Sequence, residues 1–169
     1  MARTQSHATN RKSKTKAKRR SGGQPAALAL LKKQHDEVDK LFKRFEKAKD
    51  GDKAGIVQTI CRKLTIHAQI EEEIFYPALR EAEVENDLLD EAEVEHMGVK
   101  RLVGELEAME PGEELYDAKV TVLMEYVKHH VKEEETEMFP DAKKSDVDLD
   151  ALGEQMEVRT VELEGQTDA

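Results

Sequence analysis

Residues 67–77 read HAQIEEEIFYP, and residues 130–140 repeat the pattern as HVKEEETEMFP. In each copy a histidine precedes a glutamate by four residues, and a proline follows that glutamate by six. Four residues are about one turn of an α-helix, so the histidine and the glutamate share a helix face. The proline is expected to end each helix, because it lacks a backbone N–H and its ring collides with the preceding turn. The duplicated motif predicts two helices with a His–Glu pair each, and it makes a two-metal site the first hypothesis.

The two motifs belong to a set of apolar stripes in which buried-type residues recur at steps of three and four. This spacing is typical of helices with one buried face. Residues 50–52, Pro77 with the acidic stretch after it, and residues 111–112 separate the stripes. Because short connections make neighbouring helices antiparallel, the sequence predicts an all-α, up-down-up-down four-helix bundle. The stripes span residues 28–45, 56–74, 89–106 and 120–138.

A second repeat links the two remaining helices. Residues 35–41 read HDEVDKL and residues 96–102 read HMGVKRL, so His, Val and Leu match at the same offsets. Together with the His-x3-Glu-x5-Pro motifs, this predicts two helical hairpins related by an approximate two-fold axis. Such an axis would bring the four motifs together at the centre of the bundle.

The composition predicts three regions. Residues 1–23 carry eight Lys or Arg and no acidic residue, and we expect a disordered basic tail there. The tail is interpreted either as a solubilising extension or as a contact for nucleic acid or another polyanion. Residues 24–142 contain the predicted bundle, and residues 143–169 are expected to be an acidic extension with a short closing helix. The net charge of −10 argues against nucleic-acid binding by the folded body.

The sequence also predicts a cytoplasmic protein. Cys61 is the only cysteine, which excludes an internal disulfide and fits a reducing compartment. It is expected to be a packed thiol rather than a reactive one. No apolar stretch approaches the length of about 18 residues that a membrane span needs, and none follows the basic N-terminus as in a secretion signal.

Six polar residues fall within the apolar stripes and are distributed over all four predicted helices. A carboxylate on a core face is costly unless it is paired or bound to a metal. A single core histidine is more often a hydrogen-bonded structural residue, but this combination predicts a metal site. Mixed imidazole and carboxylate ligands suit iron, manganese or zinc, and two carboxylates can bridge a pair of ions. The six candidate ligands are His35, His67, Glu71, His96, His130 and Glu134.

An alternative register exists on the fourth helix, because His129 and Glu133 are also four residues apart. The offset to Pro140 and the continuity of the apolar stripe favour His130 and Glu134 as the ligands.

Residues beside the motifs have alternative interpretations. Tyr126 lies one turn before a motif histidine and is a further candidate ligand, although a packed aromatic with an exposed hydroxyl is the default. The neighbouring acids Glu72, Glu73, Glu133 and Glu135 are interpreted as a solvated face, with the alternative that one of them is a partner of a ligating histidine.

The four segments LKKQHDEV, HAQIEEEIFYP, EAEVEHMGV and HVKEEETEMFP, in this order and spacing, resemble the hemerythrin-like family, also described as HHE cation-binding domains. The resemblance covers roughly residues 25–142. It implies a non-haem di-iron centre, with two iron ions as the cofactor. It also implies a small ligand, namely dioxygen, nitric oxide or peroxide, bound for sensing, scavenging or storage. Two alternatives are a di-iron oxidoreductase that handles peroxide or nitric oxide, and a regulatory protein tethered through its basic tail.

The chain departs from the oxygen carriers of this family at one position. Their third helix supplies two histidines one turn apart, whereas the residue one turn before His96 is Ala92, which cannot bind a metal. We therefore expect about two open coordination positions on the metal pair. Nitric oxide, peroxide or redox chemistry fits such a centre better than simple reversible oxygen carriage.

Overall fold

The computed structural model describes residues 23–84 and 86–167, and all regular structure within them is helical. The predicted basic tail lies outside the described residues, Gly23 excepted. Two short segments, η1 and η2, have the wide turn of a π-helix. The elements are α1 (Ala26–Phe45), α2 (Asp50–Ile70), η1 (Glu71–Phe75), α3 (Tyr76–Glu81), α4 (Asn86–Glu107), α5 (Tyr116–Glu133), η2 (Glu134–Met138), α6 (Phe139–Lys144) and α7 (Leu149–Thr167).

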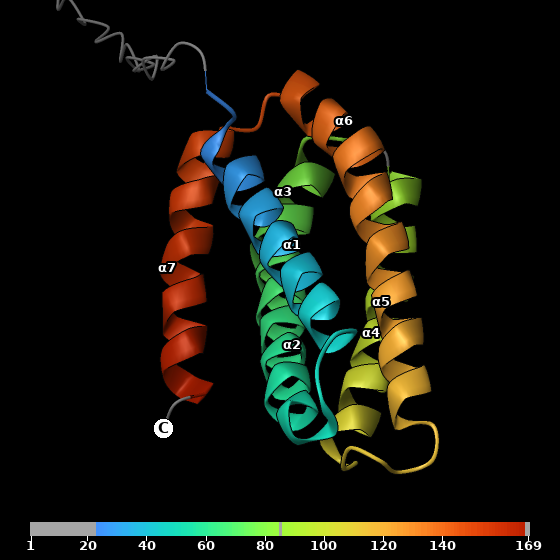
Figure 1. Ribbon diagram of the computed structural model, residues 1–169. Coiled ribbons are helices and arrows are strands. Elements are labelled where there is room, and N and C mark those ends of the chain that lie inside the picture. The colour runs from blue at the N-terminus through green and yellow to red at the C-terminus, as the bar shows by residue number, and fades with distance from the viewer. Residues whose placement is uncertain (1–22, 85, 168–169) are drawn as a thin grey trace, which may run out of the picture.

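Four helical rods form the predicted bundle (Figure 1). The rods are α1, then α2 continued by η1 and α3, then α4, and finally α5 continued by η2 and α6. Helix α1 packs against α2, α4 packs against α5, and α2 joins the two hairpins through its contacts with α4. The all-α bundle predicted from the four apolar stripes is thereby confirmed.

The expectation that the two prolines end their helices is wrong. Each helix passes through a π-turn and continues beyond its proline, to Glu81 and to Lys144. In the first π-turn the N–H of Tyr76 donates to the carbonyl of Glu71, five residues back, and the second π-turn has the same bond. The π-turn restarts the helix, so Pro77 lies in the first turn of α3, where a missing N–H costs little. Both motif glutamates consequently begin a π-turn.

The closing helix α7 is longer than the predicted short helix, with 19 residues. It packs along α1 and α2, and it lies across the molecule from α5 (Figure 1). Gly153 allows a close crossing, because a Cβ at this position would lie 2.4 Å from the backbone nitrogen of Ala27. Helix α7 therefore covers one side of the bundle and leaves the α4–α5 side uncovered by it.

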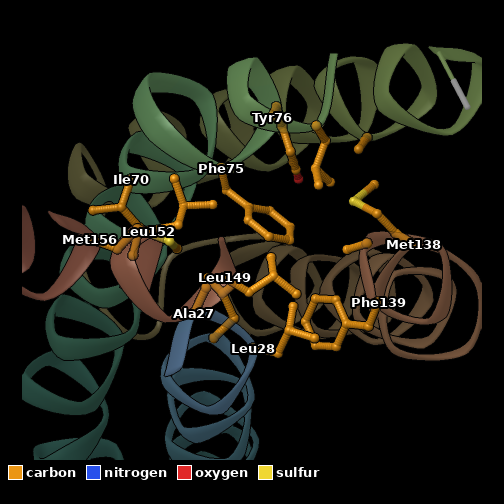
Figure 2. Close-up of a cluster of buried hydrophobic side chains, with 14 of the residues drawn as sticks. Ala27, Leu28, Ile70, Phe75, Tyr76, Met138, Phe139, Leu149, Leu152 and Met156 are labelled. Atoms are coloured by element: carbon orange, nitrogen blue, oxygen red, sulfur yellow. The ribbon is translucent and has the colours of Figure 1, made fainter. Parts of the chain in front are cut away.

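The buried apolar residues form two clusters, and the polar motif residues lie between them along each helix. One cluster joins the first turns of α1 to α3, α6 and α7, and Figure 2 shows Leu28, Phe75 and Phe139 within it. The other cluster joins the ends of α1 and α4 to the first halves of α2 and α5. Cys61 is buried in this second cluster, and burial raises the pKa of its thiol to about 12. Within residues 23–84 and 86–167, none of the helices has the length and hydropathy needed to cross a bilayer.

Candidate metal centre

The structure brings all six candidate ligands into one buried layer across the bundle. Each of the six is at most 7% exposed. Each of the four long bundle helices supplies one histidine, and each π-turn supplies one glutamate. They are His35 of α1, His67 of α2, Glu71 of η1, His96 of α4, His130 of α5 and Glu134 of η2.

The six residues form two groups that share a carboxylate. Ligand atoms of His35, His67, Glu71 and Glu134 lie within 4.8 Å of one another, and those of Glu71, His96 and His130 do likewise. The second carboxylate also reaches both halves, because Glu134 Oε2 lies 3.2 Å from His35 Nε2 and 3.7 Å from His130 Nε2. The arrangement is therefore two pairs of imidazoles with two carboxylates between them.

Carboxylates from the π-turns hold the outer nitrogens of two imidazoles. The Nδ1 atom of His35 lies 3.1 Å from Glu135 Oε1, and the Nδ1 atom of His96 lies 3.0 Å from Glu72 Oε1. Because a carboxylate can only accept, each Nδ1 carries the donated hydrogen and each neutral ring presents its Nε2 lone pair to the centre. Of the neighbouring acids, Glu72 and Glu135 are thus partners of the histidines rather than only a solvated face.

The other two imidazoles are held by the residues that precede the α1 and α4 histidines. The Nδ1 atom of His67 lies 2.8 Å from Gln34 Oε1, and the Nδ1 atom of His130 lies 2.8 Å from Glu95 Oε2. Nε2 again faces inward in both rings. Hydrogen bonds to the far nitrogen fix the tautomer and the ring orientation that metal-binding histidines require.

Two observations show that a cation fits this centre. The Nε2 atoms of His35 and His67 face each other at 3.2 Å, and so do those of His96 and His130. When both imidazoles of a pair are neutral, their facing Nε2 lone pairs repel each other unless a proton or a metal lies between them. In addition, Glu71 Oε1 and Glu134 Oε2 are buried without accepting a hydrogen bond, which costs free energy unless a cation compensates.

The charges of the centre depend on one another. Burial lowers the pKa of His67 well below its ordinary value, and burial together with the charge of Glu134 raises the pKa of Glu71 well above its own. Burial opposes ionisation of Glu134, but the imidazoles of His130 and His35 outweigh it and hold the pKa of Glu134 far below its usual range. Burial likewise opposes protonation of those two imidazoles, yet the charge of Glu134 and hydrogen bonds to carboxylates raise their pKa values. A metal would displace the protons held here.

Comparison with known proteins agrees with this geometry. The model of the family described as hemerythrin HHE cation binding domain matches residues 26–142. The chain belongs to this family. The crystal structure of an HHE cation binding domain-containing protein from Mycobacterium kansasii superposes with a TM-score of 0.70 and 26% identity, over 82% of this chain and 86% of that one.

A curated relative of this HHE domain is a larger protein. It is described as a DNA nickase from Nostoc sp. (strain PCC 7120), and it is 31% identical over 111 residues, which are 65% of this chain. The match covers 31% of the relative, so the chain spans about a third of that protein's length. The family predicted from the four motifs is confirmed, and with it a domain of cation-binding type.

Tyr76 belongs to the centre of this HHE domain and was not predicted from the sequence. Its hydroxyl lies 3.3 Å from Glu134 Oε1 and 3.4 Å from Glu71 Oε2, and it is 3.5 Å from His96 Nε2. Burial, reinforced by the two carboxylates, raises its pKa well above the ordinary value, so the hydroxyl remains a donor. A comparison of the two motifs could have pointed to Tyr76, because the matching residue in the second motif, Phe139, lacks a hydroxyl.

The residues weighed as alternatives lie elsewhere in the HHE domain. Tyr126 is 44% exposed, and its ring packs against Gly98, 3.4 Å from the place that a Cβ there would occupy, as expected for a packed aromatic. The side chain of His129 is 61% exposed, so the register with His129 and Glu133 faces outward. Ala92 is buried in the same apolar cluster as Tyr76.

A small cavity adjoins the inward nitrogens. It has a volume of about 20 Å³, which is room for one water-sized molecule. Aliphatic groups of Val38, Leu64, Val99 and Val127 line it together with the four histidines. The HHE domain therefore offers its centre an apolar space that suits a small neutral molecule better than a hydrated anion.

Proposed function

We propose that this HHE domain holds two iron ions and binds a small neutral molecule, dioxygen, nitric oxide or peroxide, for sensing, scavenging or storage. The observation that carries the proposal is the convergence of four inward-facing Nε2 atoms on two carboxylates that each reach both imidazole pairs. Nitrogen and oxygen ligands without a thiolate suit iron, and shared carboxylates suit a pair of ions.

The chain's own residues divide the task. His35 and His67 would hold one ion, His96 and His130 would hold the other, and Glu71 with Glu134 would bridge them. The bound iron would supply open coordination positions and exchangeable electrons. The carboxylates and the amide that hold each Nδ1 keep the imidazoles in place before the metal arrives, which lowers the cost of binding.

The size of the cavity favours a small ligand over a large substrate. The cavity beside the imidazoles admits about one water-sized molecule, and its aliphatic lining keeps bulk water away from the centre. The Tyr76 hydroxyl is the one described neutral donor within hydrogen-bond reach of the bridging carboxylates, and it would orient them as the ions bind.

The test is metal content after anaerobic loading with iron(II). We expect about two iron ions per chain, a spectral change with nitric oxide, and loss of the metal pair in Glu71→Ala and Glu134→Ala. Glu133→Ala is the matched control, because that carboxylate faces outward on the same helix, and it should retain iron. A folded protein that binds less than one ion would overturn the proposal. Loss of iron in Glu133→Ala alone would show that Glu133, and not Glu134, is the ligand on this helix.

An enzymatic role is the competing form of the same proposal. The vacant position beside Ala92 would leave an exchangeable site on the metal pair, which turnover of peroxide or nitric oxide needs. Catalytic consumption of either molecule by the iron-loaded chain, many equivalents per iron pair, would establish an oxidoreductase. Stoichiometric binding without turnover would leave sensing or storage.

A second candidate function concerns nucleic acid. Residues 1–23 hold eight basic residues and no acid, and a relative of the domain is described as a DNA nickase. We propose that this segment attaches the protein to DNA electrostatically. Binding to duplex DNA should weaken steeply with salt and disappear when residues 1–23 are removed, with residues 24–169 retaining the bundle. Binding that survives this truncation would contradict the proposal.

A further inference from the structure

Three side chains meet on the outer face of the α4–α5 hairpin. The Nε2 atom of His129 lies 3.2 Å from Glu133 Oε1 and 3.3 Å from Glu95 Oε1, and all three ligand atoms lie within 4.8 Å of one another. Ligand atoms around a tetrahedral zinc ion, with bonds of about 2.0 Å, are separated by about 3.3 Å. We propose that Glu95, His129 and Glu133 form a second divalent-cation site, on the surface of the domain, which shares Glu95 with the inner centre.

The site is accessible to a hydrated cation. His129 and Glu133 are four residues apart on α5 and share its outer face, while Glu95 reaches them from α4. The His129 side chain is 61% exposed, and the two glutamates are partly exposed. Helix α7 lies on the opposite side of the bundle and does not cover this face (Figure 1).

The internal repeat shows that the fold does not require these groups. In the first hairpin the residues that match His129 and Glu133 are Ile66 and Ile70, and both are buried in the cluster that includes α7. Figure 2 shows Ile70 and Met156 of that helix in the same cluster. Exposure explains why the second hairpin carries polar residues at these positions. It does not explain why the residues are a histidine and a glutamate that converge on one point.

Glu95 provides an independent indication, because its counterpart in the repeat is Gln34. The amide oxygen of Gln34 holds Nδ1 of His67 at 2.8 Å, and Glu95 Oε2 holds Nδ1 of His130 at the same 2.8 Å. A neutral oxygen is therefore sufficient to orient the inner imidazole. The charge and the second oxygen of Glu95 are additional, and that second oxygen, Oε1, is the atom that faces His129.

The ligand set defines the chemistry of the site. Two carboxylates and one neutral imidazole balance the charge of Zn²⁺ and leave a position for water. A cation on Oε1 withdraws electron density from the Glu95 carboxylate and weakens the hydrogen bond that its Oε2 accepts from His130. Occupancy of the outer site should therefore change the inner centre, and this coupling is reciprocal.

Zinc titration of the full chain tests the site, in both the metal-free and the iron-loaded protein. In each state the unmodified chain should take up about one zinc more than His129→Ala. Glu133→Gln, whose carboxylate lies beside His129 rather than beside an inner imidazole, should lose the same zinc and keep its inner metal. Glu125→Gln, an exposed carboxylate on α5 outside the cluster, is the matched control and should behave like the unmodified chain.

The comparison between variants does not depend on what the inner centre holds, so the outcome is separate from that of the iron proposal. Equal zinc uptake by His129→Ala and the unmodified chain would overturn the outer site. In the iron-loaded protein, zinc should also shift the optical spectrum of the unmodified chain but not that of His129→Ala. A spectrum unchanged by bound zinc would overturn the shared role of Glu95.

Discussion

At the residue scale, each imidazole of the centre is held by a different side chain outside it. Each histidine is fixed through Nδ1 by an outer oxygen, so the geometry is prepared before a metal binds. Apart from the imidazoles, Tyr76 is the one aromatic residue among the described contacts of Glu71 and Glu134. Its counterpart Phe139 stacks on His35 at 6.1 Å, so the two halves of the repeat differ here by a single hydroxyl.

Tyr76→Phe should destabilise the metal-free protein by about 1 kcal/mol, because the two carboxylates lose the one hydroxyl donor that they share while the ring packing is retained. Denaturant unfolding in the presence of a chelator measures the change. Tyr126→Phe is the control, since its hydroxyl lies on an exposed side chain, and it should stay within about 0.5 kcal/mol of the unmodified chain. Equal losses in the two variants would contradict the role given to the Tyr76 hydroxyl.

The metal-free protein should lose stability as pH rises above 6.5. The pKa values of His35 and His130 are raised in the folded state, so their contribution is complete below 6.5 and is lost as pH passes the folded values. The raised pKa of Glu71 acts in the same direction. The lowered pKa of His67 changes stability only below 6.5, and that of Glu134 only in acid.

Thermal unfolding with a chelator, from pH 6.5 to about 9, checks this dependence. The midpoint should fall with rising pH, and the fall should be smaller in Glu71→Gln. Bound metal should largely remove the dependence, because it displaces the protons concerned. A midpoint that stays constant in the metal-free protein would contradict the assignment.

At the scale of elements, the two π-turns and α7 shape the domain. The π-turns carry Glu71 and Glu134 at their first residues, and they allow each helix to continue past its proline. Beyond the π-turns, α3 and α6 add apolar residues to the cluster that contains Phe75 and Phe139. Helix α7 then closes that cluster from the α1–α2 side, with Met156 fully buried.

Gly153→Ala should destabilise the protein by about 1–3 kcal/mol, because the added Cβ would lie 2.4 Å from the Ala27 backbone and α7 would have to move away from α1. Gly165→Ala is a control within the same helix. It meets open space and should be neutral, or more stable by up to about 1 kcal/mol through helix propensity. Denaturant midpoints of the two variants give the comparison, and a neutral Gly153→Ala would show that α1 and α7 do not pack as closely as described.

At the scale of the whole molecule, the centre is a polar layer between two apolar clusters. Burying two carboxylates and four imidazoles there is costly without a cation, so metal binding and folding are linked. Each hairpin contributes two histidines and one glutamate to this layer. The internal repeat is therefore found on the inner faces of the hairpins, whereas their outer faces differ. The outer faces differ because α7 covers only one of them.

Iron(II) added without oxygen should raise the unfolding midpoint. A ligand at about 100 times its dissociation constant stabilises a protein by about 2.7 kcal/mol, provided that it binds only the folded state. Glu71→Ala and Glu134→Ala should lose this response, whereas Glu133→Ala should keep it. Confirmed iron binding without any change in the midpoint would mean that the metal lies outside the buried layer.

The sequence by itself determined the helix faces and the six candidate ligands. Periodicity is a local property of the chain, and a carboxylate such as Glu71 or Glu134 on an apolar stripe is costly wherever that stripe is buried. The repeat also indicated that the hairpins meet around an axis. It could not show that Pro77 and Pro140 lie within their helices, because a π-turn depends on how the helix packs.

Only the tertiary structure decided which outer residue holds each imidazole, that Tyr76 reaches the carboxylates, and that α7 covers the first hairpin alone. The pairs His130–Glu95 and His67–Gln34 join residues more than thirty positions apart. Their contacts depend on the rotation and axial offset of one helix relative to another. Those quantities are set by side-chain packing over the whole core, and no local pattern in the sequence encodes them.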